Sequence, residues 1–220
     1  MTNIAFLMPY CVILIAGYLI GSIPFGFIIG KMHGVDIRKV GSGNIGATNV
    51  TRSVGKVAGK ICFALDMLKG LLPVLILKLL VARGVIAPPA GGLGEVAVVL
   101  AVVLGHMFTI YLGFKGGKGI ATALGAVAAI APVPAAAAFL VWLLVFKISG
   151  FVSLGSIVAA LVLPVFIYLA GVLKITTPAA PGVLIFFALL ALVAVWTHRS
   201  NIKRLLNGTE NSFKKKSGDA

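Results

Sequence analysis

Three short polar segments carry the residues that could do chemistry in this chain. The first is GSGNIGATN at residues 41–49, with Arg52 just beyond it. Its three glycines allow positive φ, so that backbone N–H groups can turn toward one point, which suits a phosphate. The segment also supplies hydrogen-bonding side chains: Ser42, Asn44, Thr48 and Asn49. Taken alone, the segment could equally be an ordinary turn. The glycine spacing matches the dinucleotide-binding fingerprint, but an apolar stretch long enough to span a membrane precedes it, so we reject that interpretation.

The second segment is GFKGGKG at residues 113–119, which opens directly into an apolar, helical stretch. Backbone amides at a helix N-terminus attract anions, so this segment also predicts a phosphate site. Its candidate ligands are Gly113, Lys115, Gly116, Gly117, Lys118 and Gly119. The Walker A motif is excluded, because one residue is missing before the Gly-Lys pair and Gly119 stands where Ser or Thr would bind Mg²⁺. Anchoring at the membrane surface would explain the lysines but not the glycines.

The third segment places His198 and Asn201 at the end of the last apolar stretch. Residues three apart share a helical face, so both side chains can point into one site. A histidine at an interface is, considered alone, more often a surface group than a catalyst.

The shortage of acidic residues narrows the chemistry. Lys and Arg outnumber Asp and Glu by 19 to 5, and we expect Asp36 to be the one acid in the cytoplasmic loops. A carboxylate cage for a metal cannot then be assembled, so we expect no metal and no cofactor, and Mg²⁺-dependent phosphoryl transfer is excluded. Cations, amides and hydroxyls instead bind phosphates and stabilise oxyanions. The basic residues lie at the ends of apolar stretches, which argues against a nucleic-acid partner and is compatible with anionic lipid.

The elements that must position these segments are membrane helices. Of 220 residues, 60% are hydrophobic and 11% charged, with a mean hydropathy of +1.13, which predicts an all-α polytopic membrane protein. The apolar stretches are residues 4–30, 57–80, 95–112, 120–146, 151–171 and 181–197. We expect the first to break at Gly21, Ser22 and Pro24. Within the second, we expect Asp66 and Lys69 to pair.

The stretch 120–146 decides the topology, because it contains Pro132 and Pro134. As one span, it would give six spans and leave the basic C-terminal segment outside, against the positive-inside rule. We therefore predict seven transmembrane helices, with the N-terminus outside, the C-terminus cytoplasmic, and a Pro-broken hairpin of two short helices of about 14 residues each, roughly 21 Å long. Residues 1–206 would form one membrane domain and 207–220 a polar basic tail, expected to be disordered. This arrangement brings the three polar segments to the same cytoplasmic surface.

Five motifs resemble the bacterial acyl-phosphate:glycerol-3-phosphate acyltransferase family of the inner membrane. They are GSIPFG at 21–26, VGSGNIGATNVTR at 40–52, LDMLKG at 65–70, GHMFTIYLGFKGGKGIATALG at 105–125 and HRSNIKRLL at 198–206. The resemblance implies a seven-helix bundle whose active site faces the cytoplasm. It also implies transfer of a fatty acyl group from acyl phosphate to the 1-hydroxyl of glycerol 3-phosphate, the first acylation step of phospholipid synthesis, alongside an enzyme that makes acyl phosphate.

The resemblance carries over functional residues from each of the three segments. The motif matches are Ser42, Asn44, Thr48, Asn49, Arg52, Lys118 with its four neighbouring glycines, His198 and Asn201. We expect Arg52 and Lys118 to bind the phosphate of glycerol 3-phosphate, and Ser42, His198 and Asn201 to position its hydroxyls. A membrane carrier for an organic phosphate or lipid anion is the alternative function, because broken helices also build carrier sites.

Overall fold

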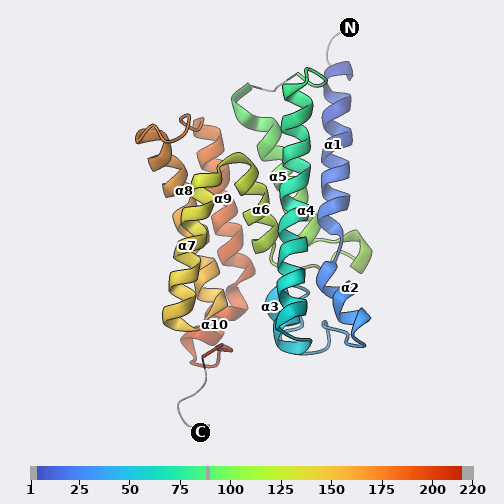
Figure 1. Ribbon diagram of the computed structural model, residues 1–220, viewed down its shortest axis with the longest axis vertical. Helices are drawn as coiled ribbons and strands as arrows, with labels where there is room; N and C mark the ends of the chain where they lie inside the picture. The colour runs from blue at the N-terminus through green and yellow to red at the C-terminus, as the bar shows by residue number, and fades with distance from the viewer. Residues whose placement is uncertain (1–3, 88–89, 215–220) are drawn as a thin grey trace. The chain divides into compact units, whose positions relative to one another are not determined.

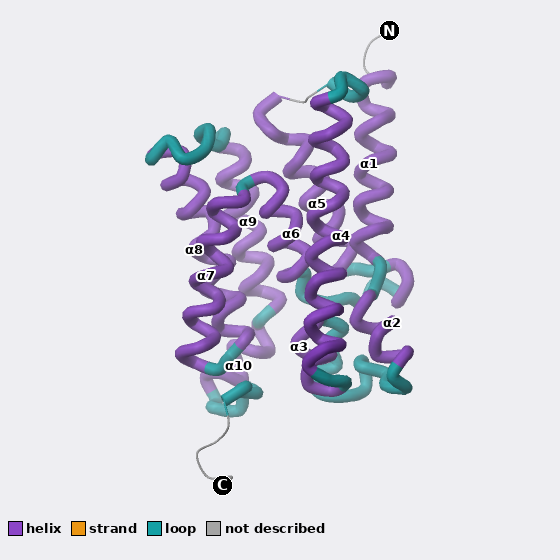
Figure 2. The backbone as a smooth tube through the Cα atoms, in the orientation of Figure 1, coloured by secondary structure: helices purple, strands orange, loops and turns teal. Residues whose placement is uncertain are grey.

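The computed structural model describes residues 4–87 and 90–214, and the regular structure within these ranges is entirely helical (Figures 1 and 2). The chain divides into two compact units, Met1–Ile130 and Ala131–Ala220. The single membrane domain predicted for residues 1–206 stays a prediction. Each unit is described by itself below.

The first unit contains six α-helices and two short 3-10 turns among its described residues. They are α1 (Ile4–Ser22), α2 (Phe25–Met32), α3 (Ala47–Ser53), α4 (Lys56–Ala82), η1 (Ala90–Gly92), α5 (Leu93–Met107), η2 (Ile110–Leu112) and α6 (Ile120–Ile130). The described part of the second unit contains α7 (Pro132–Ser149), α8 (Val152–Val172), α9 (Pro181–Thr197) and α10 (Arg199–Leu206). The predicted break in the first apolar stretch is confirmed, since α1 ends at Ser22 and α2 begins at Phe25.

Glycines hold the long helices of the first unit close together. A Cβ on Gly21 of α1 would lie 2.3 Å from the carbonyl oxygen of Val102 in α5, and one on Gly125 of α6 would lie 1.9 Å from that of Met67 in α4. Small residues allow this backbone approach, which is how helices associate when lipid offers no hydrophobic gain. In Figure 1, α1, α4 and α5 run alongside one another, and α2 and α3 lie at one end of α4.

Within residues 4–87 and 90–214, helix length and composition mark four segments that could cross a membrane, or five if the pair α9 and α10, bent by 58°, counts as one span. The four are Met8–Met32, Leu93–Leu112, Pro132–Ser149 and Val152–Val172. Helix α4 is 27 residues long, about 40 Å, but it carries buried charges. A helix break does occur at Ala131, yet the helices on either side are unequal, with 11 residues in α6 and 18 in α7. Seven spans and their topology stay predictions.

Two polar segments are more ordered than the sequence predicted. The first polar loop contains the helix α3, and residues 207–214 fold back onto α7 instead of forming a disordered tail. The backbone N–H of Phe213 donates to the carbonyl of Gly150 at 2.9 Å, and its ring meets that of Phe146 edge-on. The Lys214 ammonium donates to the carbonyl of Ile148. The prediction of disorder is therefore wrong for residues 207–214, and residues 215–220 lie outside the described ranges.

Candidate active site

Asn49 organises the first polar segment from inside. Its side chain is buried, and the Nδ2 group donates to the carbonyls of Ile37 at 2.8 Å and Val40 at 3.2 Å. Its Oδ1 accepts the backbone N–H of Ser42 at 3.0 Å. The amide is therefore engaged in closing the loop over residues 37–42, and we revise its expected role from binding substrate to shaping the loop.

Two of the three glycines in this segment adopt the conformation that the sequence predicted. Gly41 and Gly43 have φ values of 59° and 69°, whereas Gly46 precedes α3 with an extended φ of −77°. The backbone N–H of Gly46 donates to Oδ1 of Asn44 at 2.8 Å, so Asn44 also shapes the turn. Ser42 is exposed on the outer side of the loop.

One small apolar core lies beneath both glycine-rich segments of the first unit. Ile45 and Val50, from the first segment, are buried together with four residues from neighbouring elements: Ile29, Ile37, Ala58 and Cys62. Leu112, the residue before the second segment, packs against the same cluster. The two segments are therefore neighbours in the folded unit, as the phosphate-site interpretation requires.

Cationic side chains lie on both segments. Arg52 is half-buried on α3, as is Thr48, while Lys118 is half-buried and Lys115 exposed in the second segment. The nearby acid is already paired, because Nη2 of Arg38 lies 2.7 Å from Oδ2 of Asp36. Hydrogen bonding from this guanidinium holds the pKa of Asp36 well below its usual range, so Asp36 is a poor proton acceptor.

The backbone amides of the second segment are used differently from what the sequence predicted. The N–H groups of Gly116 and Gly117 donate to the carbonyls of Met107 and His106, each at 3.0 Å. The amides of residues 113–115 donate to carbonyls of residues 109–112. A Cβ on Gly117 would lie 2.2 Å from Nε2 of His106, so this glycine is needed for packing. The amides of residues 113–117 therefore shape this segment, and we no longer expect them to bind phosphate. The first turn of α6 and the two lysines become the candidate hydrogen-bond donors to phosphate.

A buried ion pair in α4 contacts the break between α1 and α2 and, through His106, the second glycine-rich segment. The predicted pairing is confirmed: Nζ of Lys69 lies 2.7 Å from Oδ1 of Asp66, with side-chain exposures of 2% and 3%. The Lys69 ammonium also donates to the carbonyl of Ile23 at 2.7 Å, at the break between α1 and α2. On the other side, Nδ1 of His106 lies 3.7 Å from Asp66, and the His106 ring packs against Gly117. This cluster links the α1–α2 break to the second glycine-rich segment.

His198 and Asn201 lie in the second unit, at the junction of α9 and α10. His198 is buried, and its Nδ1–H donates to the carbonyl of Ala194 at 2.7 Å. A carbonyl can only accept, so Nδ1 carries the proton and Nε2 is the basic nitrogen of the neutral ring. Asn201 is also buried, and its Nδ2 donates to Oε1 of Glu210 at 2.6 Å. The meeting of this pair with the two segments of the first unit stays a prediction.

Glu210 is a residue that the sequence analysis missed. Its side chain is only 4% exposed, and it accepts hydrogen bonds from Ser153, Asn201 and Arg204. Burial acts to raise the pKa of Glu210, but these hydrogen bonds outweigh burial and leave the pKa lowered, so the group is ionised at neutral pH. The sequence offered one indication of its importance: Glu210 is one of five acidic residues in a chain with 19 basic residues.

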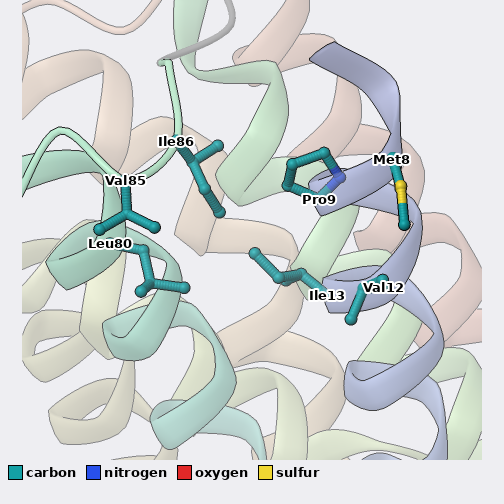
Figure 3. A pocket seen from close by; sticks show the side chains of 7 residues that line it. All are labelled: Met8, Pro9, Val12, Ile13, Leu80, Val85 and Ile86. Carbon is teal, nitrogen blue, oxygen red and sulfur yellow. The ribbon is translucent and has the colours of Figure 1, made fainter. Parts of the chain in front are cut away.

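An apolar hollow of about 310 Å³ lies between α1 and the end of α4 (Figure 3). Its lining is Met8, Pro9, Val12, Ile13, Leu80, Val85 and Ile86. These side chains offer no group that binds phosphate, and Leu80 lies at the end of α4 remote from α3. The hollow is therefore not the candidate site.

Helices of membrane-spanning length, with a buried ion pair inside α4 and glycine-rich cationic segments near helix ends, define an integral membrane protein. The family model for glycerol-3-phosphate acyltransferase matches residues 11–208. The chain is 48% identical to the glycerol-3-phosphate acyltransferase of Desulforamulus reducens over 90% of this chain and 92% of that protein, and 44% identical to that of Aquifex aeolicus over 91% and 97%.

Two solved structures share the fold. Both are crystal structures of PlsY, an integral membrane glycerol 3-phosphate acyltransferase, one in a glycerol 3-phosphate form and one in a lysophosphatidic acid form. Their TM-scores are 0.83 and 0.80, at 43% and 42% identity, and each comparison covers 94% of this chain and 96% of the other. The chain belongs to the glycerol-3-phosphate acyltransferase family. It is a multi-pass membrane acyltransferase, which decides against the carrier alternative.

Proposed function

We propose that this enzyme takes its acyl group from a fatty acyl phosphate and releases 1-acylglycerol 3-phosphate (lysophosphatidic acid) and inorganic phosphate. The observation that carries the proposal is the apolar core shared by the two glycine-rich segments, with Ile45 and Val50 on one side and Leu112 on the other. Both proposed substrates carry phosphate and therefore need two neighbouring anion sites. The relatives solved with glycerol 3-phosphate and with lysophosphatidic acid support this choice of acceptor and product.

The proposed acceptor site uses cations for the phosphate and polar side chains for the hydroxyls. Arg52 and Lys118 bind the phosphate of glycerol 3-phosphate, because charge-assisted hydrogen bonds are the strongest that a protein can offer to this group. Ser42, His198 and Asn201 orient the hydroxyls. Thr48 lies four residues before Arg52 on α3, so the two side chains share one face of this helix. Asn44 and Asn49 act on the substrate indirectly, through the shape of the loop.

The proposed donor site lies at the start of α6. The first turn of this helix begins at Ile120, and the amides of residues 120–122 precede the first amide of the helix that is used, that of Ala123, which donates to the carbonyl of Gly119. They and Lys115 bind the acyl phosphate and stabilise the oxyanion that forms on its carbonyl. Gly113, Gly116, Gly117 and Gly119 allow the tight path that brings the chain to this point.

The reaction balances without a protein base. The 1-oxygen of glycerol 3-phosphate forms a bond to the acyl carbon, the bond from that carbon to the phosphate oxygen breaks, and the hydroxyl proton passes to the departing phosphate. That phosphate becomes more basic as the bond breaks and lies beside the attacking oxygen. The hydrogen bond from Arg38 lowers the pKa of Asp36 and makes it a weak base, which leaves His33 and His198 as the protein alternatives. We favour orientation of the hydroxyl by His198 through Nε2.

We further propose seven spans in the bacterial inner membrane, with the active site facing the cytoplasm and an acyl-phosphate-producing enzyme upstream. Purified enzyme in lipid vesicles, given labelled glycerol 3-phosphate with either palmitoyl phosphate or palmitoyl-CoA, tests the donor. We expect labelled lysophosphatidic acid with palmitoyl phosphate and none with palmitoyl-CoA, and Lys118→Ala serves as the impaired control. Product formation from palmitoyl-CoA alone would refute the proposed donor while leaving the family assignment intact.

A further inference from the structure

The carboxylate of Glu210 is surrounded by donors although it lies beyond the last helix. Oε1 accepts from Oγ of Ser153 at 2.8 Å and from Nδ2 of Asn201 at 2.6 Å, and Oε2 accepts from Nε of Arg204 at 2.6 Å. Ser153 belongs to α8, and the other two residues belong to α10. The carboxylate thus connects α8, α10 and the C-terminal segment at one buried point. Figure 2 shows the loop that follows α10 folding back beside this helix.

This contact determines which way the amide of Asn201 points. A carboxylate accepts hydrogen bonds but cannot donate them, so the NH₂ group of Asn201 must face Glu210. The carbonyl oxygen of the same amide is then directed away from Glu210. A neutral partner would allow either orientation, since an uncharged amide or hydroxyl both donates and accepts.

We propose that Glu210 is a positioning residue for acyl transfer, which orients the Asn201 amide from behind and keeps α10 against α8. The inference rests on the proposed role of Asn201 in binding the substrate. Glu210 does not touch the reacting atoms and acts through its neighbour.

Anchoring of the C-terminal segment does not by itself explain the carboxylate. Phe213 contacts Gly150 and Phe146, and Lys214 contacts Ile148, so the segment has attachments that do not involve Glu210. Burying a charge costs free energy that an apolar side chain would avoid. What the carboxylate adds is acceptor-only character, and orienting Asn201 requires that property.

The experiment compares Glu210→Ala with Phe213→Ala in purified enzyme, using kcat/KM for glycerol 3-phosphate. We expect Glu210→Ala to lose about 100-fold, because a misoriented positioning group displaces the acceptor hydroxyl. Phe213→Ala removes the aromatic contact of the same segment with Phe146 and keeps the Glu210 carboxylate, and it should stay within about twofold of the parent. Equal losses in the two variants, or parental activity in Glu210→Ala, would overturn the proposal.

A charge exchange between the two partners separates orientation from folding. Asn201→Asp places two carboxylates face to face, so activity should fall at least about 100-fold. In the double variant Asn201→Asp with Glu210→Gln, the new Gln amide can donate to the new carboxylate, and about tenfold of the activity should return. A double variant that is no better than Asn201→Asp alone would contradict the inference even if Glu210→Ala does not fold.

Asn201→Ala distinguishes a failure of the proposed substrate site from a failure of the proposed role of Glu210. If Asn201→Ala has parental kcat/KM, the proposed substrate site is wrong and the inference falls with it. If Asn201→Ala is impaired but Glu210→Ala is not, only the inference fails. Thermal unfolding and gel filtration of each variant show whether a loss of activity is a loss of fold.

Discussion

Replacing Lys69 by Met tests the buried ion pair of α4. Met keeps the apolar part of the side chain, which ends at Cε, but removes the ammonium, which lies 2.7 Å from both Oδ1 of Asp66 and the carbonyl of Ile23. The carboxylate of Asp66 then stays buried without its lysine partner, and Nδ1 of His106, 3.7 Å away, is the basic group left beside it. Breaking a buried pair in this way costs about 3 to 5 kcal/mol. At about 2 to 4 °C for each kcal/mol in a chain of this length, Tm should fall by roughly 6 to 20 °C.

The assay is thermal unfolding in one detergent and lipid mixture, followed by far-UV circular dichroism, together with kcat/KM for glycerol 3-phosphate. The matched control is Lys69→Met combined with Asp66→Asn, which removes both charges. It should recover most of the lost Tm, because the penalty comes from the unpaired charge and not from the missing contact. A single variant as stable as the parent, or a double variant no more stable than the single one, would refute this account of the ion pair.

Three further predictions concern the site and its setting. Arg52→Ala and Lys118→Ala should each lose about 1.5 to 3 kcal/mol of transition-state binding, mostly as kcat/KM, while Arg52→Lys should recover only part because a point charge cannot replace a planar fork. His198→Gln and His198→Asn should keep measurable turnover with a pH profile of unchanged shape, and His198→Ala should be worse. A cysteine introduced at Ser200 should resist impermeant thiol reagents in intact cells, whereas one at Gly91 should react, because we place Ser200 in the cytoplasm and Gly91 outside.

Each of these predictions has a contrary outcome. Near-normal kinetics in both alanine variants of the cations, with the protein correctly inserted, would remove the proposed phosphate site. If all three His198 variants are equally inactive and imidazole restores His198→Ala, then His198 is the base and the substrate-assisted route is wrong. External labelling at Ser200 would support six spans and separate the three polar segments.

Much of the helical framework could be predicted from sequence because its causes are local. The last long helix was expected at 181–197 and is found at Pro181–Thr197, since the proline begins it and the apolar run ends with it. The break before Pro24 and the pairing of Asp66 with Lys69 three residues later follow from rules that span only a few residues. The residue types of the polar segments likewise favour anion binding, which stays a prediction.

The expected roles that changed all depend on neighbours distant in the chain. Asn49 is a residue type that can bind a substrate, but its side-chain amide donates to the carbonyls of Ile37 and Val40. These hydrogen bonds follow only from the path of the loop around its core. The amides of Gly116 and Gly117 looked available for phosphate, yet they close onto the end of α5. A sequence pattern shows which polar groups a segment contains, but not which of these groups already form hydrogen bonds within the fold.

Glu210 is the clearest example of a role that the sequence does not reveal. In sequence, it is one of two acids in a polar, basic segment, and nothing in its surroundings predicts burial. Ser153, one of its partners, lies 57 residues away, and they meet only because the chain turns back after α10. The sequence alone determined most of the long helices and the family. The tertiary structure decided which polar atoms face inward, because a buried hydrogen bond forms between groups that only the completed fold brings together.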